Sequence, residues 1–149
     1  MNKRDWEGQR NLLLIKGEDG QSYVKIYADK EDDMGVRFTV ETRCRGFSST
    51  LAGIYIFFDD LSDFISEFQT LENERRGEAR LRSASPDEFE LLVRIIDRAG
   101  HGLISLRLQD LSYVEIAVIP CTLEVAFSID PTTLPFILQK LTRQVQELR

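Results

Sequence analysis

Two regions of this chain alternate apolar and polar residues, and an amphipathic helical pattern follows each of them. In the first region Val36, Phe38 and Val40 occupy every second position, which predicts a strand with one buried and one solvated face. From Asp59 onward the apolar residues recur at intervals of three and four, the spacing of one face of an α-helix. The second half repeats this succession, so the sequence predicts the order strands, helix, strands, helix.

The strand segments are short and consecutive, and turn signals such as Asp19-Gly20 separate them. This arrangement favours an antiparallel meander over a parallel sheet. Gly53 is expected to mark a bulge or bend in the extended segment 47–58. Near the C-terminus, Pro120 is expected to lie just before the last strand, whose alternation points four side chains inward: Leu123, Val125, Phe127 and Ile129.

The two helices are predicted at about 59–74 and 131–147. Asp59 or Asp60 is expected to cap the first helix, and Pro131 is tolerated only in the first turn of the second. Each apolar stripe must be buried, and one face of the sheet is the available surface. The predicted fold class is therefore α+β, with one or more antiparallel meander sheets and both helices packed on one face.

The helical stripes of the two halves align with an offset of 73 residues, which places Leu61 on Leu134 and Phe68 on Leu141. One interpretation is a duplicated strand–helix unit. The alternative is coincidence, because any two amphipathic helices share such spacing.

Length and composition indicate one globular domain over residues 1–149, with residues 1–10 as a flexible end. Hydrophobic residues make up 42% of the chain, a balance typical of a folded domain. The segment after Met1 is not a signal peptide, and the apolar run Ile54–Phe58 is too short to span a bilayer. The expected location is the cytoplasm, without membrane attachment.

The formal net charge is −6, from 19 basic and 25 acidic residues. Nucleic acid phosphate would be repelled by such a surface, so a nucleic acid partner is not expected. A basic protein partner fits the charge better. Cys44 and Cys121 are 77 positions apart, and both are expected to be buried, reduced thiols.

Motifs for catalysis, cofactors or metals are weak. Asp29, Glu31 and Asp33 have the spacing of the first calcium-loop ligands, but Gly35 falls at the seventh loop position instead of the sixth, which favours a solvated turn. His101 is the single histidine and lies between two glycines, which is typical of a surface turn. Phosphate-binding glycine motifs are absent from the sequence. We therefore expect no catalytic residue, no cofactor and no metal.

A set of short motifs follows in a characteristic order: Phe58–Phe64, Gly77–Leu81, Asp97–His101 and Phe127–Leu134. Over residues 36 to 141 this order resembles the small bacterial immunity-type proteins of WapI (wall-associated protein) toxin systems. The resemblance implies a binding protein that neutralises a toxin, and it supplies no catalytic residues.

The sequence thus supports a non-catalytic binding protein whose acidic surface meets a protein partner, in particular a basic toxin domain. The residues expected at this surface are Asp29, Glu31, Asp32, Asp33 and Glu41. Two alternatives remain at this point: a small-molecule-binding module with a pocket between helix and sheet, and an enzyme of unfamiliar design.

Overall fold

A computed structural model describes residues 10–85 and 87–148. The flexible end predicted for residues 1–10 falls almost entirely outside these residues. Within the described residues, eight strands, one short 3₁₀ helix and two α-helices follow one another. They are β1 (Arg10–Lys16), β2 (Tyr23–Glu31), β3 (Gly35–Cys44), β4 (Phe47–Phe57), α2 (Phe58–Glu74), β5 (Glu78–Arg82), β6 (Phe89–Ile95), β7 (Gly102–Val114), β8 (Ala117–Ile129), η1 (Pro131–Thr133) and α3 (Leu134–Leu148).

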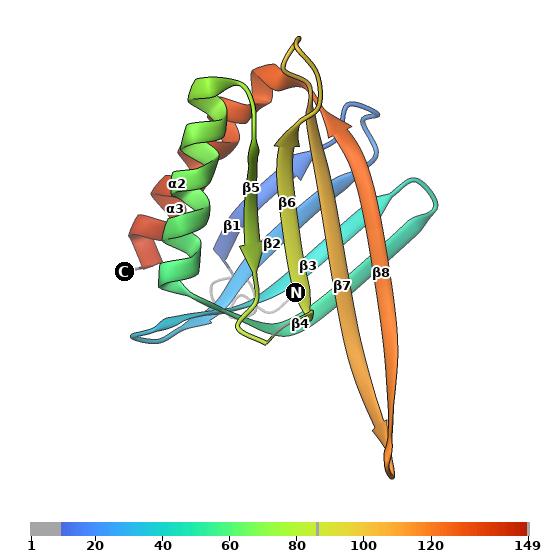
Figure 1. The fold of residues 1–149 in the computed structure, drawn as a ribbon. Helices are drawn as coiled ribbons and strands as arrows, with labels where there is room; N and C mark the ends of the chain where they lie inside the picture. The colour runs from blue at the N-terminus through green and yellow to red at the C-terminus, as the bar shows by residue number, and fades with distance from the viewer. Residues whose placement is uncertain (1–9, 86, 149) are drawn as a thin grey trace, which may run out of the picture.

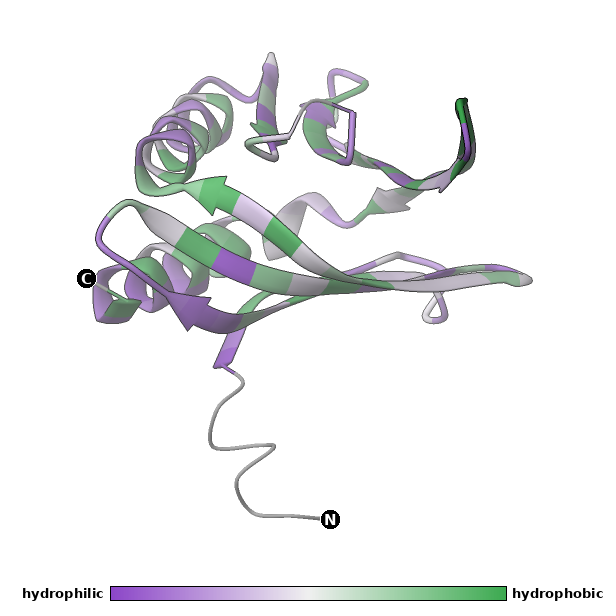
Figure 2. Ribbon diagram, turned by 90° about the horizontal axis from the view of Figure 1, so that it is seen from below, coloured by the Kyte–Doolittle hydropathy of each residue, from purple (hydrophilic) through white to green (hydrophobic). Residues whose placement is uncertain are grey.

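The strands form two four-stranded antiparallel meanders, in the orders β1-β2-β3-β4 and β5-β6-β7-β8. The two sheets face each other, and both helices lie along one side of the pair (Figure 1). Seen end-on, α2 lies in the layer of β5–β8 and α3 in the layer of β1–β4 (Figure 2). The contacts agree, since α2 packs beside β5 and α3 beside β1. The predicted α+β class and element order are confirmed.

One hydrophobic cluster fills the space between the sheets and the helices. The alternating residues of both meanders supply it, as the period of two requires. The helical stripes complete it, with Leu61, Phe64 and Phe68 from α2 and with Leu134 and Leu141 from α3. Because both halves have the same order of elements, the duplication hypothesis gains support, and it stays a hypothesis.

The start of α2 differs from the expectation. Neither Asp59 nor Asp60 caps the helix, because Phe57 holds the N-cap position and makes no side-chain cap. Both acids lie inside the first turn instead, where their charge favours the positive end of the helix dipole. Asp130 does cap η1, accepting a hydrogen bond from the backbone N–H of Thr132 over 2.9 Å.

The bulge expected at Gly53 is present. The β3–β4 register shifts between Phe38 and Val40, and Gly53 adopts a φ of 76°, which favours glycine. Its carbonyl oxygen accepts a hydrogen bond from Arg37 Nη1 over 3.1 Å. The bulge therefore bends β4 and orients Arg37 at once.

Two expectations about the end of the chain are wrong. Pro120 lies inside β8, which starts at Ala117 and forms the edge of its sheet, where proline is tolerated. Cys121 is exposed, whereas Cys44 is buried as expected. Both corrections have one cause: β7 and β8 extend past the body as a long hairpin (Figure 1). We call its exposed residues 110–122 the arm.

In the described part of the chain, no helix combines the length and the apolar content needed to cross a membrane.

Candidate functional site

An open groove of about 860 Å³ lies where the β2–β3 turn meets the junction between β4 and α2. Five carboxylate residues and four apolar residues line it. They are Glu31, Asp32, Asp33, Asp59 and Asp60, with Met34, Phe57, Phe58 and Leu148. We call this surface the acidic groove. It brings together three of the five residues predicted from the sequence.

Asp32 builds the turn on one side of the groove. Its Oδ1 atom accepts hydrogen bonds from the backbone N–H groups of Met34 (2.8 Å) and Gly35 (2.9 Å), and from the hydroxyl of Tyr55 (2.8 Å). These bonds lower the pKa of Asp32, the Met34 N–H contributing most. The pKa of Tyr55 is raised, mainly because its hydroxyl is partly removed from water and also because it hydrogen-bonds to Asp32. Asp32 therefore shapes the groove, and its carboxylate is occupied by these hydrogen bonds within the protein.

The apolar part of the groove comes from both segments. Met34 has 65% of its surface exposed and Phe57 has 41%. The backbone N–H of Phe58 donates to the Met34 carbonyl over 2.9 Å, which fixes the turn against the start of α2. Exposed thioether and aromatic groups at this position give a partner apolar surface to cover.

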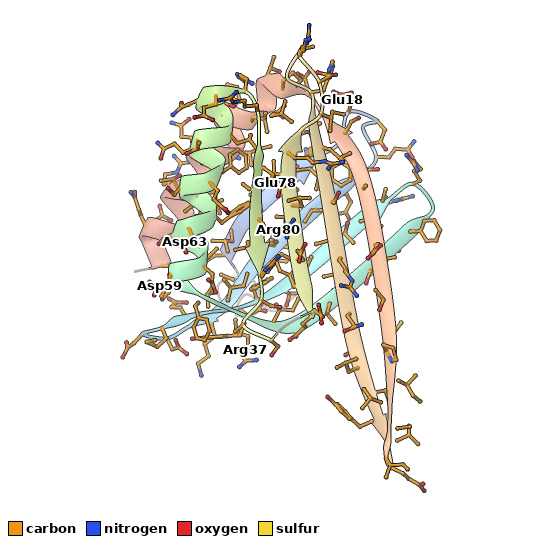
Figure 3. All side chains as sticks on the ribbon, viewed as in Figure 1. Glu18, Arg37, Asp59, Asp63, Glu78 and Arg80 are labelled. Atoms are coloured by element: carbon orange, nitrogen blue, oxygen red, sulfur yellow. The ribbon has the colours of Figure 1, made fainter. Side chains whose placement is uncertain are left out.

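Four of the groove acids remain open to a partner. The side chains of Glu31, Asp33, Asp59 and Asp60 make no hydrogen bond or ion pair with any residue that the structure describes. The lining contains no lysine or arginine among those residues. Figure 3 shows Asp59 at the start of α2 and Asp63 one turn further along the same helix, so the negative charge continues from the groove along α2.

The other two predicted residues lie outside the groove. Asp29 precedes the turn, and its Oδ2 accepts the hydroxyl of Thr39 over 2.6 Å. Glu41 is on β3, where it accepts the hydroxyls of Tyr23 (3.3 Å) and Tyr27 (3.0 Å). It lines a separate polar hollow that also contains Arg43 and Arg45.

Sequence reasoning missed Met34, Phe57, Asp59 and Asp60 as members of this surface. Met34 belongs to a loop that was interpreted only through its acids. The sequence predicts Asp59 and Asp60 as helix caps, and this structural role accounts for their presence without any binding site. The two acidic segments meet because β3 pairs with β4, which sets Gly35 opposite Phe57, and because the Phe58 N–H donates to the Met34 carbonyl oxygen.

His101 lies in a loop, with 43% of its side chain exposed. Its Nδ1 atom is 2.7 Å from Asp97 Oδ2. A hydroxyl or thiol nucleophile activated by His101 would contact the other ring nitrogen, and the described hydrogen bonds include none there. Across the described residues, no three His, Cys, Asp or Glu side chains group as a metal site.

Residues 14–149 match the model of the Immunity protein WapI-like family. The chain belongs to this family. The match extends the resemblance seen in residues 36–141 to nearly the whole chain, and so it includes the acidic groove and the arm. No match was found among curated proteins or among solved structures. Membership of the WapI-like immunity family implies a protein partner.

Proposed function

We propose that this protein neutralises a toxin by direct contact, and that the acidic groove receives a basic surface of that toxin. The observation that carries the proposal is the composition of the groove, where five acids surround exposed Met34 and Phe57. Family membership supports the toxin as the partner.

The two components of the groove have different roles in binding. Carboxylates steer an oppositely charged partner and raise its association rate, an effect that salt screens. Apolar groups supply most of the affinity once water leaves the interface. Tight binding at a toxin's working surface would block its activity without any chemistry on the part of this chain.

Glu31 and Asp33 are the residues to change first, because their side chains make no hydrogen bond or ion pair with the described residues. Asp32 must stay, since it holds the turn, and Asp59 and Asp60 stabilise the first turn of α2. The test variant is Glu31→Gln with Asp33→Asn. The charge-matched control is Glu18→Gln with Glu74→Gln, which removes two exposed acids that do not line the groove.

The measurement is the affinity for the toxin domain that we expect the neighbouring gene to encode, produced as an inactive variant. We expect the test variant to bind about tenfold more weakly at low salt, and the difference to shrink as salt rises. The control should bind like the wild type. If the wild-type chain neither binds that domain nor protects cells that produce it, the proposed function is wrong.

A further inference from the structure

The arm exposes an unusual amount of apolar surface. Of the twelve large apolar side chains exposed in the described chain, six lie within nine consecutive positions. They are Leu111, Tyr113, Val114, Ile116, Val118 and Ile119. Figure 2 shows the tip of this hairpin as one of the most hydrophobic parts of the ribbon. Monomeric proteins rarely leave such a contiguous patch without a partner.

Both faces of the arm are apolar. Tyr113 pairs with Val118, and Leu111 with Pro120, so these four side chains share one face. The opposite face carries the pairs Val114–Ala117 and Ser112–Ile119, and it continues the inward face of the sheet beyond the core. A flat partner would cover one face and leave the other in water. A concave partner covers both.

The arm carries only negative charge, which favours a partner with basic residues. The chain has no lysine, arginine or histidine between Arg107 and Lys140, and the arm contains Asp110 and Glu115. Two arms of separate copies would therefore bring four carboxylates together with no basic residue between them. A cleft with basic side chains at its rim complements the arm instead.

The arm and the acidic groove lie at the same end of the molecule. Tyr55, which binds Asp32 at the groove, has the Arg37 guanidinium 5.9 Å from its ring centroid. Burial is the main cause that raises the pKa of Glu88; the charge of Asp110 raises this pKa further and the charge of Arg37 lowers it. The carbonyl oxygen of Glu88 accepts the N–H of Gln109 over 3.0 Å. In Figure 3, Arg37 lies between Asp59 and the root of the arm.

We infer that the arm is a wedge that enters an apolar, basic-rimmed cleft of the same protein partner that contacts the acidic groove. This inference rests on the proposed function and extends it. The acidic groove contacts the surface beside the cleft, and the arm fills the cleft. A toxin with its cleft filled in this way is closed to its substrate.

The test uses two variants that each change one face of the arm and keep β-branched residues in the strands. The first is Tyr113→Thr with Val118→Thr, and the second is Val114→Thr with Ile119→Thr. The matched control is Phe47→Thr, since Phe47 is equally exposed but lies at the β3–β4 turn. All these side chains are outside the core, so unchanged unfolding midpoints verify that each variant folds.

The probe is the inactive toxin domain already used for the groove. We expect each face variant to lose about tenfold or more in affinity, mainly through faster dissociation, and the control to be unchanged. If only one of the two face variants loses affinity, the wedge proposal is wrong, because that result indicates a flat partner. Tight binding by both face variants would also overturn it and leave the groove proposal intact, whereas absence of wild-type binding rejects both.

Two measurements on the protein alone examine other occupants. Sedimentation of the wild-type chain should show a monomer, and a dimer that the face variants abolish would assign the arm to a second copy. Flotation with phosphatidylcholine vesicles should leave the protein at the bottom of the gradient. Flotation that depends on Tyr113 and Val118 would assign the arm to lipid instead.

Discussion

Phe38 on β3 and Phe89 on β6 meet edge-to-face across the two sheets, with ring centroids 5.2 Å apart and planes at 80°. Both rings are fully buried. This pair joins the first meander to the second at the centre of the common cluster. Edge-to-face aromatic pairs add to the stabilisation that burial alone provides.

Phe89→Ala should therefore lower the free energy of unfolding by about 3–5 kcal/mol, because it removes a buried ring and leaves a cavity between the sheets. Phe47→Ala, at an exposed ring, should have little effect. Denaturant titration followed by fluorescence and by circular dichroism measures both. If residues 1–149 form one domain, the two signals should change in a single transition, and two separated transitions would contradict this.

Gly35 allows the close approach of β3 to β4 at the edge of the groove. A Cβ atom at this position would collide with the Ile56 carbonyl oxygen and would lie 2.8 Å from Tyr55 Cζ. Gly35→Ala should reduce stability by about 1–3 kcal/mol, through the strain of an overpacked site. Gly46→Ala is the control, since nothing lies within 4 Å of its Cβ position. Equal unfolding midpoints for the two variants would show that this approach is not tight.

Acid should destabilise the fold through Asp19. The Ser22 hydroxyl, the Ser22 N–H and the Gln21 N–H lower the pKa of this carboxyl from 3.8 to about 2. Because the pKa is lower in the folded state, the stabilisation is complete above the unfolded value and is lost as the pH falls from 3.8 toward 2. Asp19→Asn should flatten the loss of stability between these pH values, measured by denaturant titration at each pH. An unaltered pH profile would contradict this role.

Thiol labelling should separate the two cysteines. Cys121 is exposed on the arm, whereas Cys44 is buried with its Sγ 3.4 Å from the Ala126 carbonyl oxygen. A thiol reagent should modify one cysteine rapidly in the native protein and both after denaturation. The variant Cys121→Ser should remove the rapid phase. Partner binding should protect Cys121 if the arm enters a cleft, which gives an independent readout of that contact.

The local elements followed from the sequence because their signals are local. Alternation around Phe38 and the stripe through Leu61 and Phe64 each depend on a few neighbouring residues, and both predictions are confirmed. The division into two sheets depends on which strand edges meet, which periodicity does not record. The sequence does not predict the arm, because apolar residues on both of its faces leave no alternation of apolar and polar positions. Pro120 also indicates the start of a strand, whereas it lies inside β8.

The sequence predicts one side of the acidic groove, the acids of the β2–β3 turn, but not the other side. Glu31, Asp32 and Asp33 adjoin one another in the sequence, so their charge is visible without a structure. Asp59 reaches the same groove because β3 pairs with β4 as far as Phe57, and because Phe58 then hydrogen-bonds to Met34. Contacts of that range have no signature in a single sequence.

Each helix follows one meander but lies in the layer of the other, α2 beside β5 and α3 beside β1. Neither half can therefore complete its own core, since the helix of each half packs beside the sheet of the other. Residues 10–76 and 77–148, produced as separate fragments, should each remain incompletely packed and should recover the native form only on mixing. If the chain arose by duplication, the single ancestral unit would have had to exchange helices with a second copy, and joining the two copies in one chain would have made that exchange permanent.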